Sequence, residues 1–185
     1  MFKHLATGLI LFAAACTAPA DRVNLPQQSS DLSLRANVNS ALVRTVSLPS
    51  YAAAEELATQ SASGLITTNP SVLWADDPQR AMTLSLARQL GDILAVTVAP
   101  EPWPFIDLPD VAVDIRIAEL LATSNGNLRL TGQFFVAGDR IAYPNITRSF
   151  DLSEPLPDTG LATIAAAQSR ILLTLAEEIA RSLGR

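Results

Sequence analysis

The stretch VAVDIRI at residues 111–117 decides the fold, because a large apolar side chain occupies every second position, the period of a β-strand. Residues 127–136 alternate in the same way. The intervening turn, SNGN at 124–127, contains Asn-Gly, a pair that tolerates the positive φ angles of a tight hairpin. A second turn at 137–139 leads into residues 140–150. The sequence therefore predicts a three-stranded antiparallel meander.

The segments on either side of the meander carry weaker signals. We predict strands at 31–37 and 40–48, a helix over 51–60, a hairpin of two extended pieces at 64–68 and 71–75, a second helix after Asp76 and Asp77, a strand beginning at 95–98, a proline-rich loop over 99–109, and a long amphipathic helix over 159–183. This order predicts a single domain of the α/β (α+β) class. It would have one mixed, largely antiparallel sheet with helices packed on it, including the long C-terminal helix.

The second of these helices has the clearest start signal. Asp76 or Asp77 is expected to cap it, because Pro78 stands in its first turn, where a missing N–H costs nothing. Its apolar residues, including Met82 and Leu86, recur at gaps of three and four and form one stripe. We therefore interpret the two carboxylates as a helix cap rather than as acid–base catalysts.

The beginning of the chain resembles the signal peptide and lipobox of a bacterial lipoprotein. Lys3 precedes a short apolar run, LILFAAA at residues 9–15, which ends directly before Cys16. The run is too short for a membrane span, which needs about 20 apolar residues. Ala13 stands where leucine is usual, and the alternative is an ordinary secretory signal with an incidental cysteine. We predict a signal peptide over 1–15, lipidation at Cys16, a flexible leader over 16–30 and a domain over 31–185.

Composition limits the classes of function. The chain has 185 residues, of which 49% are hydrophobic and 17% charged, so it can form a sizeable core. Its formal charge of −5 becomes −6 when Lys3 is removed. An acidic chain without a basic run is a poor candidate for binding nucleic acid or anionic headgroups by general attraction. We expect no nucleic-acid partner.

The mature chain would also lack most catalytic residue types. Lys3 is the only lysine and His4 the only histidine, and Cys16 is the only cysteine. Cleavage before Cys16 thus excludes Ser-His and Cys-His pairs, Schiff-base lysines, and histidine or thiolate metal sites. We expect no enzyme activity, no cofactor and no metal, and no disulfide within the mature chain.

Several short motifs resemble one known family. They are VSLPSY at 46–51, WADD at 74–77 leading into a helix, PWP at 102–104, and a long Ala/Leu-rich C-terminal helix in a chain with a lipobox. In this order they resemble the ABC-type transport auxiliary lipoproteins, the PqiC-like family. Members usually carry glutamate where this chain has Asp76 or Asp77, a departure that does not touch the fold.

The resemblance implies a lipid-anchored periplasmic α/β domain that acts with a mammalian-cell-entry (MCE) domain protein, PqiB-like, and its transporter. Such systems move lipids between the inner and outer membranes and maintain membrane integrity. The resemblance also implies a homo-oligomeric ring as one form of assembly. In the sorting convention of enterobacteria, aspartate after the lipidated cysteine retains a lipoprotein in the inner membrane, so Thr17 favours the periplasmic face of the outer membrane.

Two aromatic residues of the proline-rich loop are candidate contacts. Trp103 and Phe105 would touch a partner or a lipid, because loops present interaction residues, or would simply be covered by the domain. Trp74, beside a helix start, is expected in the core. The leading hypothesis is an auxiliary subunit of an MCE-type transport system. The alternatives are a free-standing lipoprotein that binds a ligand or lipid, and a hydrolase that uses carboxylates alone.

Overall fold

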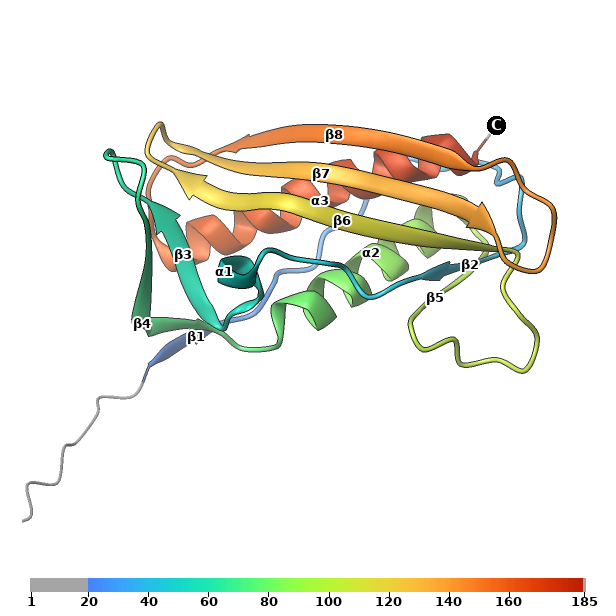
Figure 1. Ribbon diagram of the computed structural model, residues 1–185, viewed down its shortest axis with the longest axis horizontal. Helices are drawn as coiled ribbons and strands as arrows, with labels where there is room; N and C mark the ends of the chain where they lie inside the picture. The colour runs from blue at the N-terminus through green and yellow to red at the C-terminus, as the bar shows by residue number, and fades with distance from the viewer. Residues whose placement is uncertain (1–19, 185) are drawn as a thin grey trace, which may run out of the picture.

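Helices α2 and α3 cover one face of an eight-stranded mixed sheet in the computed structural model, which describes residues 20–184 (Figure 1). In chain order the elements are β1 Asp21–Val23, β2 Ser40–Val43, α1 Ser50–Ala53, β3 Glu56–Gln60, β4 Ile66–Trp74, α2 Pro78–Leu94, β5 Thr97–Pro100, β6 Val111–Thr123, β7 Asn127–Gly138, β8 Ile146–Pro155 and α3 Leu161–Leu183. The fold class predicted from the sequence is confirmed.

The long strands β6, β7 and β8 form the predicted antiparallel meander, and they are the longest pairings in the sheet. Gly126 has φ +78° in the β6–β7 turn, the positive φ that the Asn-Gly pair at 125–126 predicts. β6 also pairs in parallel with β2 near its start and with β3 near its end. The sheet continues from β3 to β4 and β1 on one side, and from β2 to β5 on the other.

The core lies between the sheet and the two helices. Val113, Ile115 and Phe134 point from β6 and β7 toward the helices and are buried, as Leu90 of α2 and Leu175 of α3 are. The predicted apolar stripes of both helices therefore face the sheet. Trp74 is also buried, as expected, at the end of β4.

The helix cap is confirmed and assigned to Asp77. Its carboxylate accepts a hydrogen bond from the backbone N of Arg80 at 2.7 Å, and Pro78 is the first residue of α2. Asp76 instead forms an ion pair with the Arg80 side chain. Both carboxylates are thus engaged at the start of this helix.

The predicted helix over 51–60 is wrong. Only Ser50–Ala53 is helical, and Glu56–Gln60 forms β3, which pairs with β4. The alanine-rich segment has a helical propensity, but cross-strand pairing outweighs so small a preference. The predicted hairpin at 64–68 and 71–75 is also wrong, because residues 66–74 form the single strand β4. Asn69 and Pro70 lie where its register with β3 shifts.

Several predicted strands differ from the strands of the structure. Residues 31–37 form no strand and contribute only an isolated bridge from Ala36 to Gly184. The strand predicted over 40–48 ends at Val43, although Arg44 N and Ser47 N still donate to carbonyls of β6. β8 begins at Ile146 rather than at residue 140. Pro144, which has no N–H for a ladder, lies in the loop before it.

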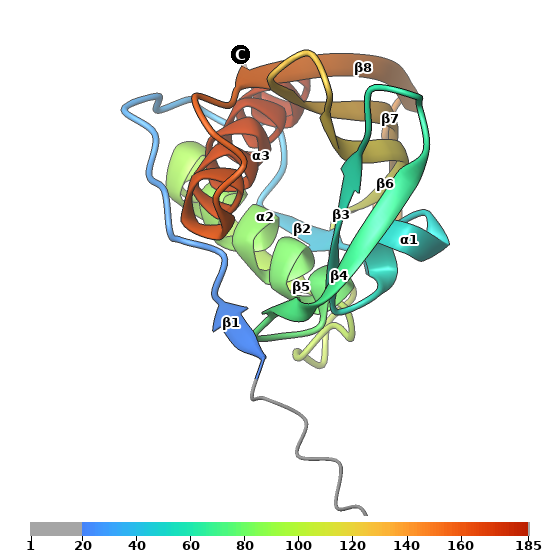
Figure 2. The ribbon, with the colours of Figure 1, turned by 90° about the vertical axis from the view of Figure 1, so that its left-hand side faces the viewer.

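Residues 20–30, the described part of the leader predicted over 16–30, contact the rest of the domain, and we call them the leader segment. β1 within it pairs in parallel with β4. Further on, the Pro26 carbonyl accepts a hydrogen bond from Ser169 Oγ, and Ser30 Oγ donates to the Glu177 carboxylate, both on α3. Figure 2 shows the segment passing along the outer side of the helices, away from the sheet. Leu25 also packs against the core.

Candidate functional site

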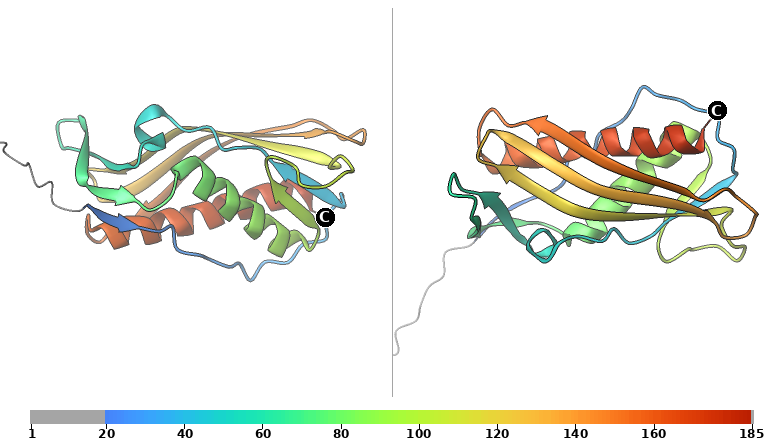
Figure 3. Two further views of the ribbon diagram at one scale, coloured as in Figure 1. Left: turned by 90° about the horizontal axis from the view of Figure 1, so that it is seen from below. Right: turned by 45° about the horizontal axis from the view of Figure 1, so that its top comes forward.

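The loop over residues 101–109, between β5 and β6, exposes the most prominent apolar group of the described chain. Phe105 is 54% exposed, Ile106 104% and Leu108 59%. We call this segment the apolar loop. It lies at one end of the long axis, and the chain enters the domain at the other end, beside β1 (Figures 1 and 3).

Contacts within the apolar loop hold its tip together. The Trp103 and Phe105 rings meet edge to face, with centroids 5.0 Å apart and an interplanar angle of 68°. Trp103 Nε1 also donates a hydrogen bond to the Asp107 carbonyl. Edge-to-face pairing is a favourable aromatic geometry, and the indole N–H has the partner that it needs. The loop therefore presents Phe105 and Ile106 from an ordered turn.

The start of the apolar loop is hydrogen-bonded to the end of β2 and the residues after it. Glu101 N donates to the Val43 carbonyl at 2.8 Å, and the Glu101 carboxylate accepts from Thr45 N at 3.0 Å. The loop thus leaves the sheet along a fixed path, although its tip is exposed.

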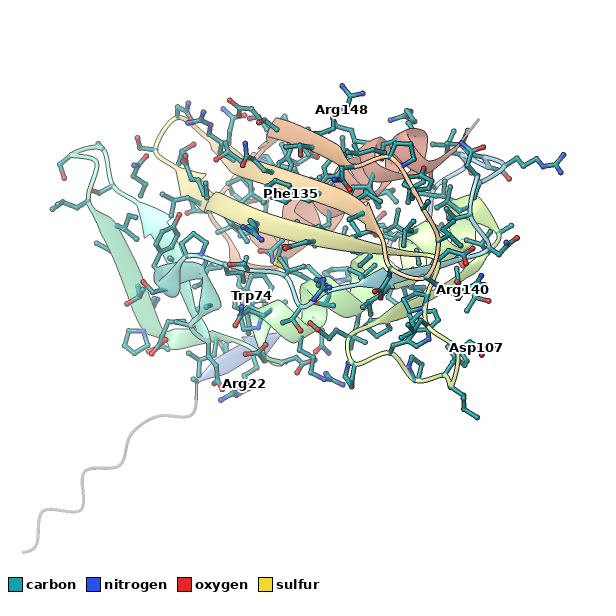
Figure 4. The ribbon with its side chains drawn as sticks, turned by 45° about the vertical axis from the view of Figure 1, so that its right-hand side comes forward. Arg22, Trp74, Asp107, Phe135, Arg140 and Arg148 are labelled. Carbon is teal, nitrogen blue, oxygen red and sulfur yellow. The ribbon has the colours of Figure 1, made fainter. Side chains whose placement is uncertain are left out.

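The other end of the apolar loop is held by Asp110, which is only 1% exposed. Its Oδ2 accepts hydrogen bonds from Asn39 N at 2.8 Å and Asn39 Nδ2 at 3.3 Å, and its Oδ1 accepts from Arg140. Asp110 N donates to Ser40 Oγ at 2.9 Å. One carboxylate therefore joins β2, β6 and the β7–β8 loop beneath the apolar loop. Figure 4 shows Arg140 and Asp107 at this same end of the molecule.

These donors also affect the ionisation of Asp110. The hydrogen bond from Asn39 N lowers the pKa of the carboxyl group, burial opposes that shift, and Arg140 lowers the pKa further. The charged form is therefore the one that the fold stabilises. Sequence reasoning missed Asp110 and Arg140. The available signal was an acidic residue placed directly before an apolar strand.

The structure thus brings the two predicted contact residues, Trp103 and Phe105, together at the tip of the apolar loop. Cys16, the predicted lipidation site, and Thr17 lie outside the described residues. Leu65 and Ile66, in and after the β3–β4 turn, are a second exposed apolar pair, at the opposite end from the apolar loop (Figure 1).

Residues 20–184 contain neither a candidate metal site nor a candidate membrane-spanning helix. Over residues 20–184 no three His, Cys, Asp or Glu side chains come together in a group that could hold a metal ion. In the same range no helix has both the length and the hydropathy of a membrane span.

Comparison with known proteins gives one family and a set of related folds. The family model described as "ABC-type transport auxiliary lipoprotein component" matches residues 24–180. A crystal structure titled only as an uncharacterized protein is 17% identical, covers 90% of this chain and all of its own, and superposes with a TM-score of 0.73. A Xanthomonas campestris protein of the DUF330 family is 14% identical, with 86% and 92% of the two chains covered and a TM-score of 0.69. No curated protein matches the sequence.

Proposed function

Because the chain belongs to the ABC-type transport auxiliary lipoprotein family, we propose that it is a non-enzymatic, lipid-anchored subunit that docks on a protein of an MCE-type lipid transport system. In this proposal Cys16 carries the acyl chains and the domain lies at the periplasmic face of the outer membrane. The system moves lipids between the inner and outer membranes and so maintains membrane integrity. The apolar loop makes the contact with the MCE-domain partner.

The observation that carries this proposal is the placement of the apolar loop opposite the tethered end. Ala20 follows Cys16 by four positions, and an extended chain covers at most about 3.6 Å per residue, so Ala20 lies within about 14 Å of the anchor. From β1 onward the leader segment is bonded to the domain. An anchored domain therefore turns its β1 end toward the anchoring membrane, and the apolar loop faces away from it.

This orientation favours a protein partner for the apolar loop over the anchoring bilayer. Exposed aromatic and aliphatic side chains grouped on an ordered loop are typical of interaction sites. Phe105 and Ile106 would be covered by an apolar pocket of the partner. The Asp110 hydrogen bonds would reduce the ordering that the loop undergoes on binding.

The test is a pull-down of the full-length lipidated protein from membranes, with mass spectrometry of its mature N-terminus and of the co-purifying proteins. The variants are F105S/I106S in the apolar loop and L65S/I66S as a matched control at the other end. A Cys16→Ser protein reports on the anchor. We expect an acylated Cys16, capture of an MCE-domain protein by the wild type and by L65S/I66S, and at least tenfold weaker capture by F105S/I106S.

Three results would contradict the proposal. An unmodified N-terminus would show that Cys16 carries no lipid anchor. The absence of an MCE-domain protein from the wild-type sample would show that such a protein is not the partner. Equal capture by F105S/I106S and the wild type would show that the apolar loop is not the contact. Light scattering on the same sample reports whether the docked form is a homo-oligomeric ring.

The alternative function, a lipoprotein that binds a ligand or lipid by itself, is favoured by a different observation. A groove of about 480 Å³ runs between the leader segment and α2. This volume falls in the range of small-molecule sites. The groove is at a different place from the apolar loop, so docking and ligand binding can be tested separately.

A further inference from the structure

The groove beside α2 has one wall from the leader segment and one from the helix. Asn24, Leu25, Pro26 and Gln27 form the first wall. The second wall comes from helix positions 81, 84, 85 and 88, which share one face because of their spacing. With a rise of 1.5 Å per residue, about 10 Å of helix separates position 81 from position 88. We call this elongated site the leader groove.

Arg88 is an unpaired cation in the leader groove. It is half-buried, and no ion pair or hydrogen bond engages its guanidinium among residues 20–184. The other arginines without an ion pair in this range, Arg35, Arg44 and Arg148, are exposed to solvent. The remaining described arginines pair with carboxylates. Because partial burial of a charge without a partner is unfavourable, the site is complementary to an anion.

A polar group without a partner lies next to this cation. Ser85 is 9% exposed, and its Oγ has no hydrogen-bond partner in the described protein. It precedes Arg88 by three positions, so the two side chains are neighbours on the helix surface. A hydroxyl donor beside a guanidinium suits a phosphate oxygen.

No carboxylate near the leader groove forms an ion pair with Arg88 among the described residues. Asp76 lines the groove before the start of α2 and is ion-paired with Arg80. Asp92, one helical turn after Arg88, is exposed and forms no ion pair with it. Among the charged residues that line the leader groove, Arg88 is therefore the one without an ion-pair partner.

Apolar side chains line the rest of the leader groove. Leu84 on α2 is 40% exposed, and Leu25 and Pro26 face the same groove from the leader segment. A ligand that satisfies both parts needs an anionic head and an aliphatic chain. An inorganic anion would pair with Arg88 but leave the apolar lining uncovered, and a neutral acyl chain would cover the lining but leave Arg88 unpaired.

We propose that the leader groove binds an anionic phospholipid, with its phosphate at Arg88 and Ser85 and part of an acyl chain along Leu84 and Leu25. This site goes beyond the docking role of the apolar loop. The acyl anchor of the protein itself is a weaker candidate, because an acyl chain has no anionic group for Arg88. The site lies in the part of the domain that the tether keeps near the membrane, where phospholipid is available.

The test uses full-length lipidated protein in mild detergent and native mass spectrometry. The probes are phosphatidylglycerol, a diacylglycerol with the same chains, and inorganic phosphate. We expect phosphatidylglycerol adducts on the wild type and on Arg148→Gln, an exposed control that removes the same charge. Arg88→Gln should weaken binding about tenfold, since a hydrogen bond to a charged group contributes about 1.5–3 kcal/mol and 1.4 kcal/mol is tenfold.

A second variant tests the groove without changing its charge. Ala81→Phe places a ring against the leader segment and is expected to reduce phosphatidylglycerol binding as well. The thermal midpoint of Arg88→Gln should be unchanged or higher, because the guanidinium has no partner to lose. The MCE-partner capture of Arg88→Gln should equal that of the wild type, which separates this proposal from the docking function.

Each contrary result has a distinct meaning. Undiminished binding by Arg88→Gln, or an equal loss in Arg148→Gln, would overturn the proposal in favour of general attraction to the surface. Equal binding of diacylglycerol would overturn the role of the anionic head. Complete competition by inorganic phosphate at comparable concentration would show that the anion is free phosphate and not a phospholipid.

Discussion

Replacing Asp110 by asparagine tests how the base of the apolar loop is held. All the side-chain partners of Asp110, two nitrogens of Asn39 and the Arg140 guanidinium, are donors. Asparagine keeps one acceptor oxygen but turns an NH₂ group toward a donor. At least one charge-assisted hydrogen bond is therefore lost at a position that is 1% exposed.

The expected cost of Asp110→Asn is about 2 kcal/mol, because a hydrogen bond to a charged group contributes about 1.5–3 kcal/mol. The expected free-energy cost lies in the lower part of that range because Arg140 is half-exposed and water can solvate it in the variant. For a domain of this size, about 2 kcal/mol lowers the thermal midpoint by about 4–8 °C.

Urea denaturation measures this loss, and hydrogen exchange over residues 101–110 locates it. Asp107→Asn is the matched control, because Asp107 lies in the same loop, is exposed, and its carboxylate has no partner among the described residues (Figure 4). Asp107→Asn should leave stability within about 0.5 kcal/mol of the wild type. Asp110→Asn should also speed exchange in the apolar loop.

The effect should depend on pH. The folded state lowers the pKa of Asp110, so its charged form contributes stability that is complete above the ordinary aspartate pKa of about 3.9. That contribution is lost as the pH falls through the lowered pKa. The difference between the wild type and Asp110→Asn should thus be full at pH 6–7 and shrink in acid.

The reasoning would be refuted if Asp110→Asn and Asp107→Asn had the same stability at pH 7. A large loss for Asp110→Asn that stayed constant into acid would also refute it, because the loss would then not come from the carboxylate charge. Either result would mean that other contacts hold the base of the apolar loop.

Two further substitutions test the packing of the sheet and its helices. Gly132→Ala should cost about 3 kcal/mol, since its Cβ would collide with the Arg116 carbonyl oxygen and lie 2.8 Å from Phe150 Cζ, and overpacking typically costs about 1–3 kcal/mol. Urea denaturation checks this cost. A cost below that of Gly64→Ala, where the added Cβ meets open space and the strain comes only from a φ of +83°, would contradict the reasoning. Leu175→Ala should cost about 3 kcal/mol, because this side chain is fully buried against the sheet and large-to-small core changes cost about 2–5 kcal/mol. The same measurement on Leu84→Ala, at a leucine that is 40% exposed, should show a smaller loss, and equal losses at the two leucines would contradict the packing described here.

Sequence patterns predicted the elements whose cause is local. Alternation and the Asn-Gly turn were enough for β6 and β7, and the aspartate before Pro78 was enough for the start of α2. The apolar stripe over 159–183 likewise predicted α3, which the structure has at Leu161–Leu183. In each case the pattern repeats within a few residues, so the neighbouring side chains in the sequence carry the information.

The missed elements have distant causes. Glu56–Gln60 is a strand because β4 pairs with it, and its composition alone suggested a helix. β6 runs six residues past the predicted end at Ile117, because a register shift between Ile117 and Glu119 breaks the alternation without ending the pairing. The leader segment is ordered by contacts with β4 and α3, which lie far from it in the sequence.

Some features of the candidate site can likewise be predicted from the sequence, and others depend on the tertiary structure. The sequence by itself determined the family, the proline-rich loop with Trp103 and Phe105, and the absence of lysine and histidine after residue 4. Only the tertiary structure decided that Asp110 meets Arg140 beneath that loop and that Arg88 has no partner in the leader groove. The reason is physical, since an ion pair or an unpaired charge depends on which side chains the fold brings within a few ångströms, and such neighbours leave no periodic mark on the sequence.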